Sequence, residues 1–179
     1  MSNTLLLISD EHNPFYSSVY GHPFVQTPNM DWLAQQGPVF DNAYCPSPLC
    51  MPCRSAFMTG KRVHQIQSYN NCAINLDLGM ATYGRILAEQ GVHTVHIGKT
   101  HVYSPDSKLG FSEMIRSGDH GYPGDTEIGR HPLQVRHHAC HRADGYGLDP
   151  LYLNTDLGHV ESAIQWLTAA IKRGTPHGH

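Results

Sequence analysis

Hydrophobic and polar positions alternate along the chain in the way that short strands and helices produce. Runs of β-branched and aliphatic residues predict strands, and apolar residues three or four positions apart predict helices that end at glycine. The predicted elements are strands at residues 4–9 and 92–97, helices at residues 28–37, 82–91 and 159–172, and a strand or extended segment at residues 39–44. A strand, a helix and another strand are typical of a parallel sheet flanked by helices on both faces, so we expect an α/β fold.

Two polar clusters come directly after the predicted strands. Residues 10–13 read Asp-Glu-His-Asn after the first strand, and residues 99–101 read Lys-Thr-His after the later one. Ligands of parallel sheets bind beyond the carboxyl ends of the strands. The two clusters are therefore candidate site residues.

The last third of the chain does not continue this succession of predicted strands and helices. Residues 116–147 are rich in Gly, His, Asp and Arg without a period, which predicts a long irregular excursion such as a pocket wall. No strand follows the helix predicted at residues 159–172. The 179 residues suit one domain by length, but the missing strand predicts that this domain is truncated.

Composition excludes some classes of partner. The chain has 12 basic and 15 acidic residues and a net charge of −3, with no basic stripe, so we expect no nucleic-acid partner. The apolar run at residues 5–8 is too short for a signal peptide, and no segment is long enough for a membrane span. With 5 cysteines and no secretory signal, we expect reduced thiols in a cytoplasmic protein. The oligomeric state stays open.

The cysteines allow several interpretations. Cys45, Cys50 and Cys53 have the spacing C-x4-C-x2-C, and with Cys72 they match an iron–sulfur loop formally. Zinc bound with the help of the histidines in residues 137–141 is a second interpretation. Small buried thiols are the third.

Cys50 differs from the other cysteines because it precedes a predicted helix. Pro52 suits the first turn of this helix, and Gly60 suits its end. Cys50 is therefore expected at a helix N-terminus, with Arg54 one turn further on. Unpaired N–H groups beside a guanidinium favour an oxyanion.

The same stretch carries a family resemblance. Cys50-Met-Pro-Cys-Arg54, followed by Thr59-Gly60-Lys61, resembles the C-x-P-x-R…T-G-[KR] signature of type I sulfatases in the alkaline-phosphatase-like superfamily. The segments "FDNAYCPSPLCMPCRSAFMTGK", "YNNCA" and "GKTHVYSPD" are most similar to the choline-sulfatase and phosphonate-monoester-hydrolase branch. The resemblance implies that residues 1–179 are the N-terminal part of a sulfatase catalytic domain.

The resemblance also implies a chemistry. A maturation enzyme, the formylglycine-generating enzyme, would oxidise Cys50 to formylglycine, whose hydrate attacks the sulfur of a small-molecule sulfate ester. Arg54 would hold this nucleophile. Lys99 and His101 would contact the sulfate or the leaving oxygen, and Asn71 would orient the substrate.

A divalent metal completes the implied site. Asp10, Glu11 and the modified Cys50 would bind it, and oxygen ligands fit Ca²⁺, with Mg²⁺ or Mn²⁺ as alternatives. Glu11 stands where many sulfatases have a second Asp. Asp119 and His120 have the residue types of a further ligand pair of the family, but they lie inside the predicted irregular excursion.

Two other interpretations of function stay open. The same site would also suit a phosphonate monoester or phosphodiester hydrolase. The chain would alternatively be a truncated, inactive sulfatase fragment, because the family is longer than 179 residues.

Overall fold

The computed structural model describes residues 3–10, 12–71, 76, 79–104, 108–117 and 150–173. The chain divides into two compact units, Ser2–Tyr44 and Cys45–His179. Glu11, Cys72, Asp119 and His120 lie outside the described residues, as does most of the excursion predicted at residues 116–147.

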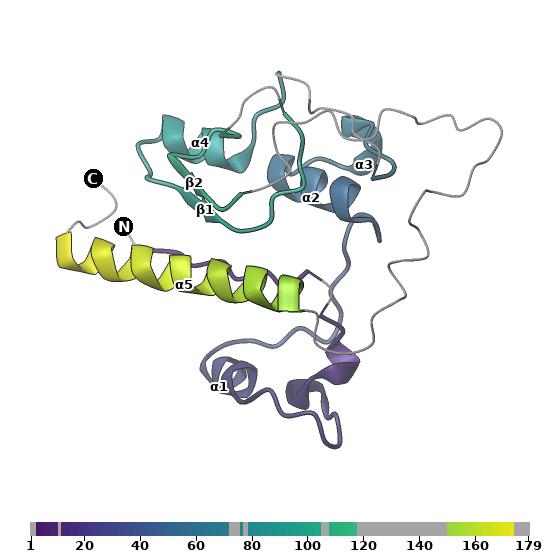
Figure 1. The fold of residues 1–179 in the computed structure, drawn as a ribbon. Helices are drawn as coiled ribbons and strands as arrows, with labels where there is room; N and C mark the ends of the chain where they lie inside the picture. Colours follow the sequence, from purple (N-terminus) through teal and green to yellow (C-terminus); the bar gives the residue numbers. More distant parts are fainter. Residues whose placement is uncertain are drawn as a thin grey trace. The chain divides into compact units, whose positions relative to one another are not determined.

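The first unit contains short helices (Figure 1), and hydrogen bonds between polar side chains connect them. Two 3₁₀ turns, η1 (Pro14–Tyr16) and η2 (Ser18–Tyr20), precede helix α1 (Pro28–Gln36). The Ser18 hydroxyl donates to Asp31 at 2.8 Å and lies 2.7 Å from the hydroxyl of Thr27. These bonds fix η2 against the first turn of α1.

Helix α1 confirms the helix predicted at residues 28–37. Thr27 is the N-cap residue, and Pro28 is the first helical residue, a position where its missing N–H costs no hydrogen bond. Gly37 follows the last turn as expected.

The strand predicted at residues 4–9 is not formed, and this prediction was wrong. The described residues of the first unit contain no strand, and Leu7 is 74% exposed. A strand needs a neighbouring strand to pair its N–H and C=O groups, and none is present within this unit's described part. Residues 39–44 are likewise outside any strand, and Tyr44 is 91% exposed.

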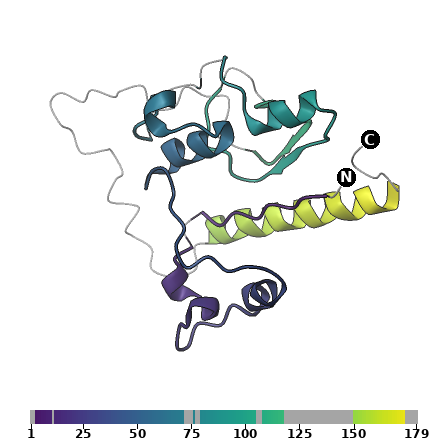
Figure 2. The same cartoon turned by 180° about the vertical axis from the view of Figure 1, so that it is seen from behind.

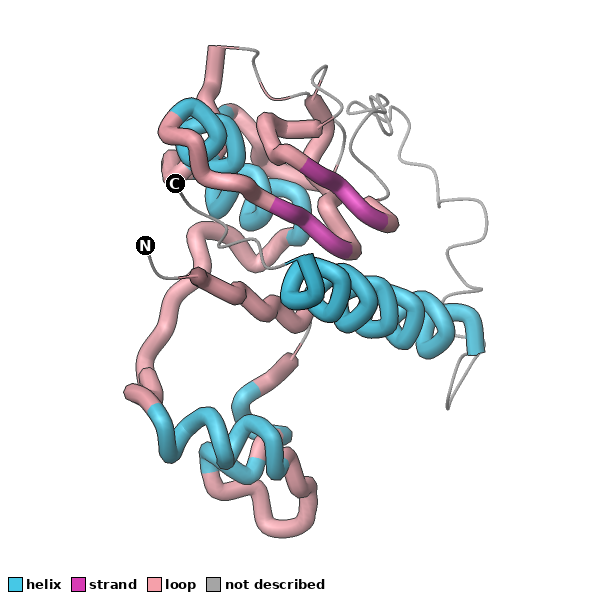
Figure 3. Tube along the Cα trace, turned by 90° about the vertical axis from the view of Figure 1, so that its left-hand side faces the viewer, coloured by secondary structure: helices cyan, strands magenta, loops and turns pink. Residues whose placement is uncertain are grey.

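The second unit holds the sheet. Strand β1 (Val95–Ile97) pairs in parallel with β2 (Glu113–Ile115), with His96 opposite Met114. Helices α2 (Cys50–Thr59), α3 (Val63–Ile66) and α4 (Tyr83–Glu89) precede the strands, and the 24-residue α5 (Pro150–Arg173) follows them. Helices α2 and α4 lie on one side of the strands and α5 on the other (Figures 1 and 3). The predicted α/β class with a parallel sheet between helices is confirmed for this unit.

An apolar core lies between α2, α3, α4 and the segments that flank the strands. Its buried members are Ala56, Met58, Ile66, Leu76, Val102, Leu109 and Phe111. The Tyr83 ring packs edge-to-face on Phe111 at 5.2 Å. This core fixes the carboxyl end of β1 relative to α2.

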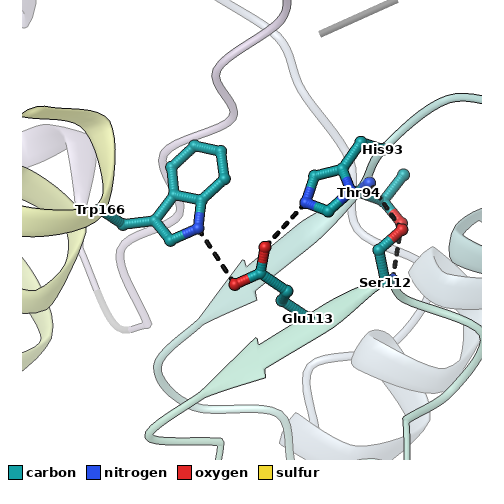
Figure 4. Close-up of polar contacts among 5 residues, drawn as sticks. All are labelled: His93, Thr94, Ser112, Glu113 and Trp166. Atoms are coloured by element: carbon teal, nitrogen blue, oxygen red, sulfur yellow. Dashed lines mark hydrogen bonds and ion pairs between the residues drawn. The ribbon is translucent and has the colours of Figure 1, made fainter. Parts of the chain in front are cut away.

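Helix α5 contacts β1 on the other side (Figure 2). Trp166 donates its indole N–H to Glu113 at 3.2 Å, and Glu113 also accepts from His93 at 2.8 Å (Figure 4). Arg116 Nε lies 2.8 Å from the hydroxyl of Ser162. Among the described residues, no helix combines the length and the apolar character that crossing a bilayer requires.

Candidate active site

Cys50 is the first residue of α2, as the sequence predicts. The helix buries Met51, Pro52, Ser55, Ala56 and Met58, so its start is anchored in the protein interior. Gly60 ends it in the left-handed conformation, with φ of 65°, which glycine adopts without a Cβ clash. The position of Cys50 follows from local signals at both ends of the helix.

His101 lies directly beside Cys50. Its Nδ1 atom is 3.1 Å from the Cys50 Sγ atom. His101 has a φ of 47°, the left-handed region that is uncommon for residues other than glycine. Such backbone conformations persist where the surroundings hold them, and they concentrate at functional sites.

Arg54 connects α2 to the residues that follow β1. Its Nη1 atom donates to the backbone carbonyl of Lys99 at 3.0 Å. Lys99 is exposed to solvent. The predicted set of Cys50, Arg54, Lys99 and His101 is therefore assembled from two segments, at the start of α2 and beyond the carboxyl end of β1.

Asn71 also contacts the start of α2. Its Oδ1 atom accepts a hydrogen bond of 2.9 Å from the Met51 N–H. The resemblance to sulfatases implies that Asn71 lies near the substrate, whereas the observed contact is with the backbone of the residue after Cys50.

Tyr103 is a site residue that the sequence did not single out. It forms a small buried cluster with Met51, and its ring meets the His101 ring edge-on at 5.9 Å. Tyr103 thus supports both the helix that carries Cys50 and the imidazole beside it. The only sequence signal was an aromatic residue two positions after His101.

The thiols of Cys45 and Cys53 are neighbours. Burial raises the pKa of the Cys53 thiol, and the charge of the nearby Cys45 and a hydrogen bond with it raise this pKa further, while Arg54 lowers it. Cys45 itself donates to the carbonyl of Ser47 at 3.1 Å. Cys53 therefore holds its proton more tightly than an ordinary thiol.

No three His, Cys, Asp or Glu side chains within the described ranges come close enough together to hold a metal ion. Asp10 lies in the first unit and Glu11 outside the described residues, so their predicted role as metal ligands stays a prediction. The same holds for a cluster that includes Cys72 and for zinc bound through residues 137–141.

Curated sulfatases are similar in sequence to this chain. The chain is 31% identical to an N-acetylglucosamine-6-O-sulfatase of Bacteroides thetaiotaomicron over 136 residues, which are 74% of this chain and 24% of that protein. It is 32% identical to a choline-sulfatase of Rhizobium meliloti, with 69% of this chain and 23% of that protein covered. The chain thus spans about a quarter of the length of these curated relatives.

A solved structure agrees with these relatives. The structure of a protein in complex with its substrate D-glucosamine-2-N,6-O-disulfate matches with a TM-score of 0.54 and 33% identity, over 59% of this chain and 21% of that one. The likeness confirms the alkaline-phosphatase-like fold class for the matched part. The family model named Sulfatase matches residues 2–149. This chain belongs to the sulfatase family.

Proposed function

We propose that this protein hydrolyses sulfate esters with a formylglycine nucleophile made from Cys50. The observation that carries the proposal is the 3.1 Å contact between Cys50 Sγ and His101 Nδ1 at the first turn of α2. In a chain of the sulfatase family, this contact puts a general acid or base beside the signature cysteine. The Cys50 thiol occupies the position that the formylglycine takes after modification.

The modified residue supplies a hydrated aldehyde with two hydroxyl groups on one carbon, one to accept the sulfuryl group and one to expel it. His101 is close enough to exchange a proton with a hydroxyl at the position of the Cys50 Sγ atom. Arg54 brings positive charge to the first turns of α2, where the helix dipole also favours an anion, and it bonds to the carbonyl of Lys99. We expect the ammonium group of Lys99 to add to this charge when a sulfate is bound. These groups suit the binding of a sulfate and the stabilisation of charge on its oxygens.

We further propose that a divalent metal binds through Asp10, Glu11 and the modified Cys50. Oxygen donors fit Ca²⁺, Mg²⁺ or Mn²⁺, so the chemistry of the donor set agrees with such an ion. Ca²⁺ takes six to eight ligands, so further ligands have to join these three. The metal would supply positive charge that lowers the pKa of a coordinated hydroxyl.

The substrate class that we propose is a small-molecule sulfate ester. Two relatives are named for the sulfate esters of choline and of N-acetylglucosamine, which are both small. A phosphonate monoester on the same site is the alternative, and the turnover experiment includes such an ester as a second substrate.

The modification is the first test. The chain is co-expressed with a formylglycine-generating enzyme and digested with chymotrypsin, which cuts after Leu49 and Phe57 and releases Cys50 and Cys53 in one peptide. We expect an aldehyde at Cys50 that reacts with a hydrazide probe, while Cys53 remains an alkylatable thiol. Only unmodified thiol at Cys50, with Cys50→Ala as the blank, contradicts the formylglycine proposal.

Turnover is the second test. Release of sulfate from a generic aryl sulfate by the modified chain, lost in Cys50→Ala, is the expected result. Hydrolysis of an aryl phosphonate monoester in preference to the sulfate contradicts the sulfatase assignment. An aldehyde at Cys50 without turnover of either ester means that these 179 residues do not suffice for activity.

A further inference from the structure

Helix α2 lacks a cap of its own at the end that carries Cys50. Its N-cap residue is Leu49, whose side chain makes no capping hydrogen bond and has no atom that could. Within the first turn, Pro52 has no N–H, and the N–H of Cys53 already donates to the Leu49 carbonyl at 3.0 Å. The Met51 N–H therefore needs an acceptor from elsewhere. Met51 is 0% exposed, so water is a poor candidate.

Asn71 is that acceptor, 20 residues later in the chain. Its Oδ1 atom receives the Met51 N–H at 2.9 Å. An asparagine side chain is among the best N-terminal caps, although it usually sits at the helix start itself. Here the cap comes from the segment beyond α3.

This bond also orients the amide of Asn71. Because the helix fixes the direction of the Met51 N–H, the oxygen of the amide must face α2, and the NH₂ group becomes its outward end. The outward end is then a donor and not an acceptor. A donor at this residue suits an anionic substrate.

We infer that Asn71 is a positioning residue, which caps α2 and thereby holds the side chain of residue 50 against His101. The inference rests on the proposed function of Cys50, but the cap and the contact exist in the unmodified chain and are measurable without turnover. Asn71 would therefore stabilise the start of α2 in addition to orienting the substrate.

Three variants separate the cap from the donor. Asn71→Asp keeps an oxygen for the Met51 N–H and loses the NH₂ group, whereas Asn71→Ala loses both. Asn71 is exposed, so neither change opens the core. Asn13→Ala is the matched control, because it removes a bond of the same kind, from the Phe15 N–H to Asn13 Oδ1 at 3.0 Å, in the other unit.

The first readout is hydrogen exchange of the Met51 amide, measured by NMR on the 19.9 kDa chain. We expect exchange to quicken by about five- to tenfold in Asn71→Ala, the change that loss of a helix cap produces. Asn71→Asp and Asn13→Ala should match the wild type. An unchanged Met51 amide in Asn71→Ala overturns the capping part.

The second readout tests the positioning of Cys50. The rate of Cys50 alkylation by iodoacetamide is measured with and without His101→Asn, in wild-type, Asn71→Asp and Asn71→Ala backgrounds. If Asn71 holds Cys50 against His101, His101→Asn changes the rate in the first two backgrounds and has little effect in the third. Equal effects of His101→Asn in all three backgrounds overturn the inference, and this result says nothing against sulfate-ester hydrolysis.

Discussion

The Nδ1 atom of His101 lies 3.1 Å from the Sγ atom of Cys50, although 51 residues separate them in the chain. One residue begins helix α2 and the other follows strand β1, and a shared apolar core joins these elements. Tyr103 packs against both the helix start and the imidazole. The contact is thus a consequence of the fold and not of a local motif.

Replacement of His101 tests the value of this contact for catalysis. We expect His101→Asn to lower turnover of an aryl sulfate by about 10²–10⁴-fold, the usual contribution of a general acid or base. Asparagine tolerates the left-handed backbone that His101 adopts at φ of 47°, so the loop keeps its conformation. A steady-state assay of the modified protein measures the loss, and circular dichroism checks the fold.

If His101→Asn keeps its fold and retains full activity, the role of His101 as a general acid or base is contradicted. His93→Asn is the matched control, since His93 bonds to Glu113 and lies outside the site. It should leave turnover close to that of the wild type.

Arg54→Lys tests the link between α2 and the residues after β1. A lysine keeps the positive charge but lacks the planar fork of arginine, so the bond to the Lys99 carbonyl at 3.0 Å should be lost. Loss of one such bond costs about 1 kcal/mol, and for a chain of this length it lowers Tm by about 2–4 °C. Calorimetry measures the shift.

Arg173→Lys, at the end of α5, is the control for this exchange and should leave Tm unchanged. A Tm of Arg54→Lys equal to that of the wild type would mean that the bond to Lys99 does not stabilise the site.

The start of α2 was predictable because its signals are local. Pro52 and Gly60 mark the first turn and the end of the helix, and they alone place Cys50 and Arg54 one turn apart. That His101 belongs to the same site as Cys50 was expected from the rule that ligands gather beyond parallel strands and from the resemblance to sulfatases. The Asn71 bond was not foreseen, because a hydrogen bond across 20 residues leaves no periodic pattern.

The strands were harder to predict than the helices for a physical reason. An apolar run records a tendency to be buried, but a strand exists only where a neighbour pairs with it. Residues 4–9 contain such an apolar run, but the described part of their unit contains no strand that could pair with them. Conversely, β2 (Glu113–Ile115) has only three residues and no alternating pattern, yet it pairs with β1.

Cys53 is expected to react slowly with alkylating agents. Burial raises the pKa of its thiol, the neighbouring Cys45 raises it further, and a protonated thiol is a poor nucleophile. In Cys45→Ala the second cause is removed, so the pKa of Cys53 should fall and its alkylation should quicken at mildly alkaline pH. Mass spectrometry of iodoacetamide-treated protein over time measures the rate. An unchanged or slower rate in Cys45→Ala would show that Cys45 does not influence Cys53.

The docking of α5 on the sheet should weaken in acid. Burial alone would raise the pKa of Glu113, but the hydrogen bonds from His93 and Trp166 outweigh it and lower this pKa (Figure 4). A carboxyl group with a lowered pKa stabilises the folded state above its unfolded pKa, and this contribution disappears as pH falls through the lowered value. Because Glu113 is 41% exposed, solvent screening limits the contribution to below about 1 kcal/mol.

Fluorescence of Trp166 reports this docking in a Trp32→Phe background, since the chain has 2 tryptophans. We expect the emission to shift toward that of exposed tryptophan as the solution becomes more acidic than the usual Glu pKa of 4.5. Glu113→Gln should show a reduced transition, because its side chain does not titrate, whereas Glu89→Gln at the end of α4 should behave like the wild type. The carboxylate of Glu113 accepts hydrogen bonds from both Trp166 and His93, and its protonation weakens them. If Glu113→Gln shows the same transition as the wild type, another group causes the acid response.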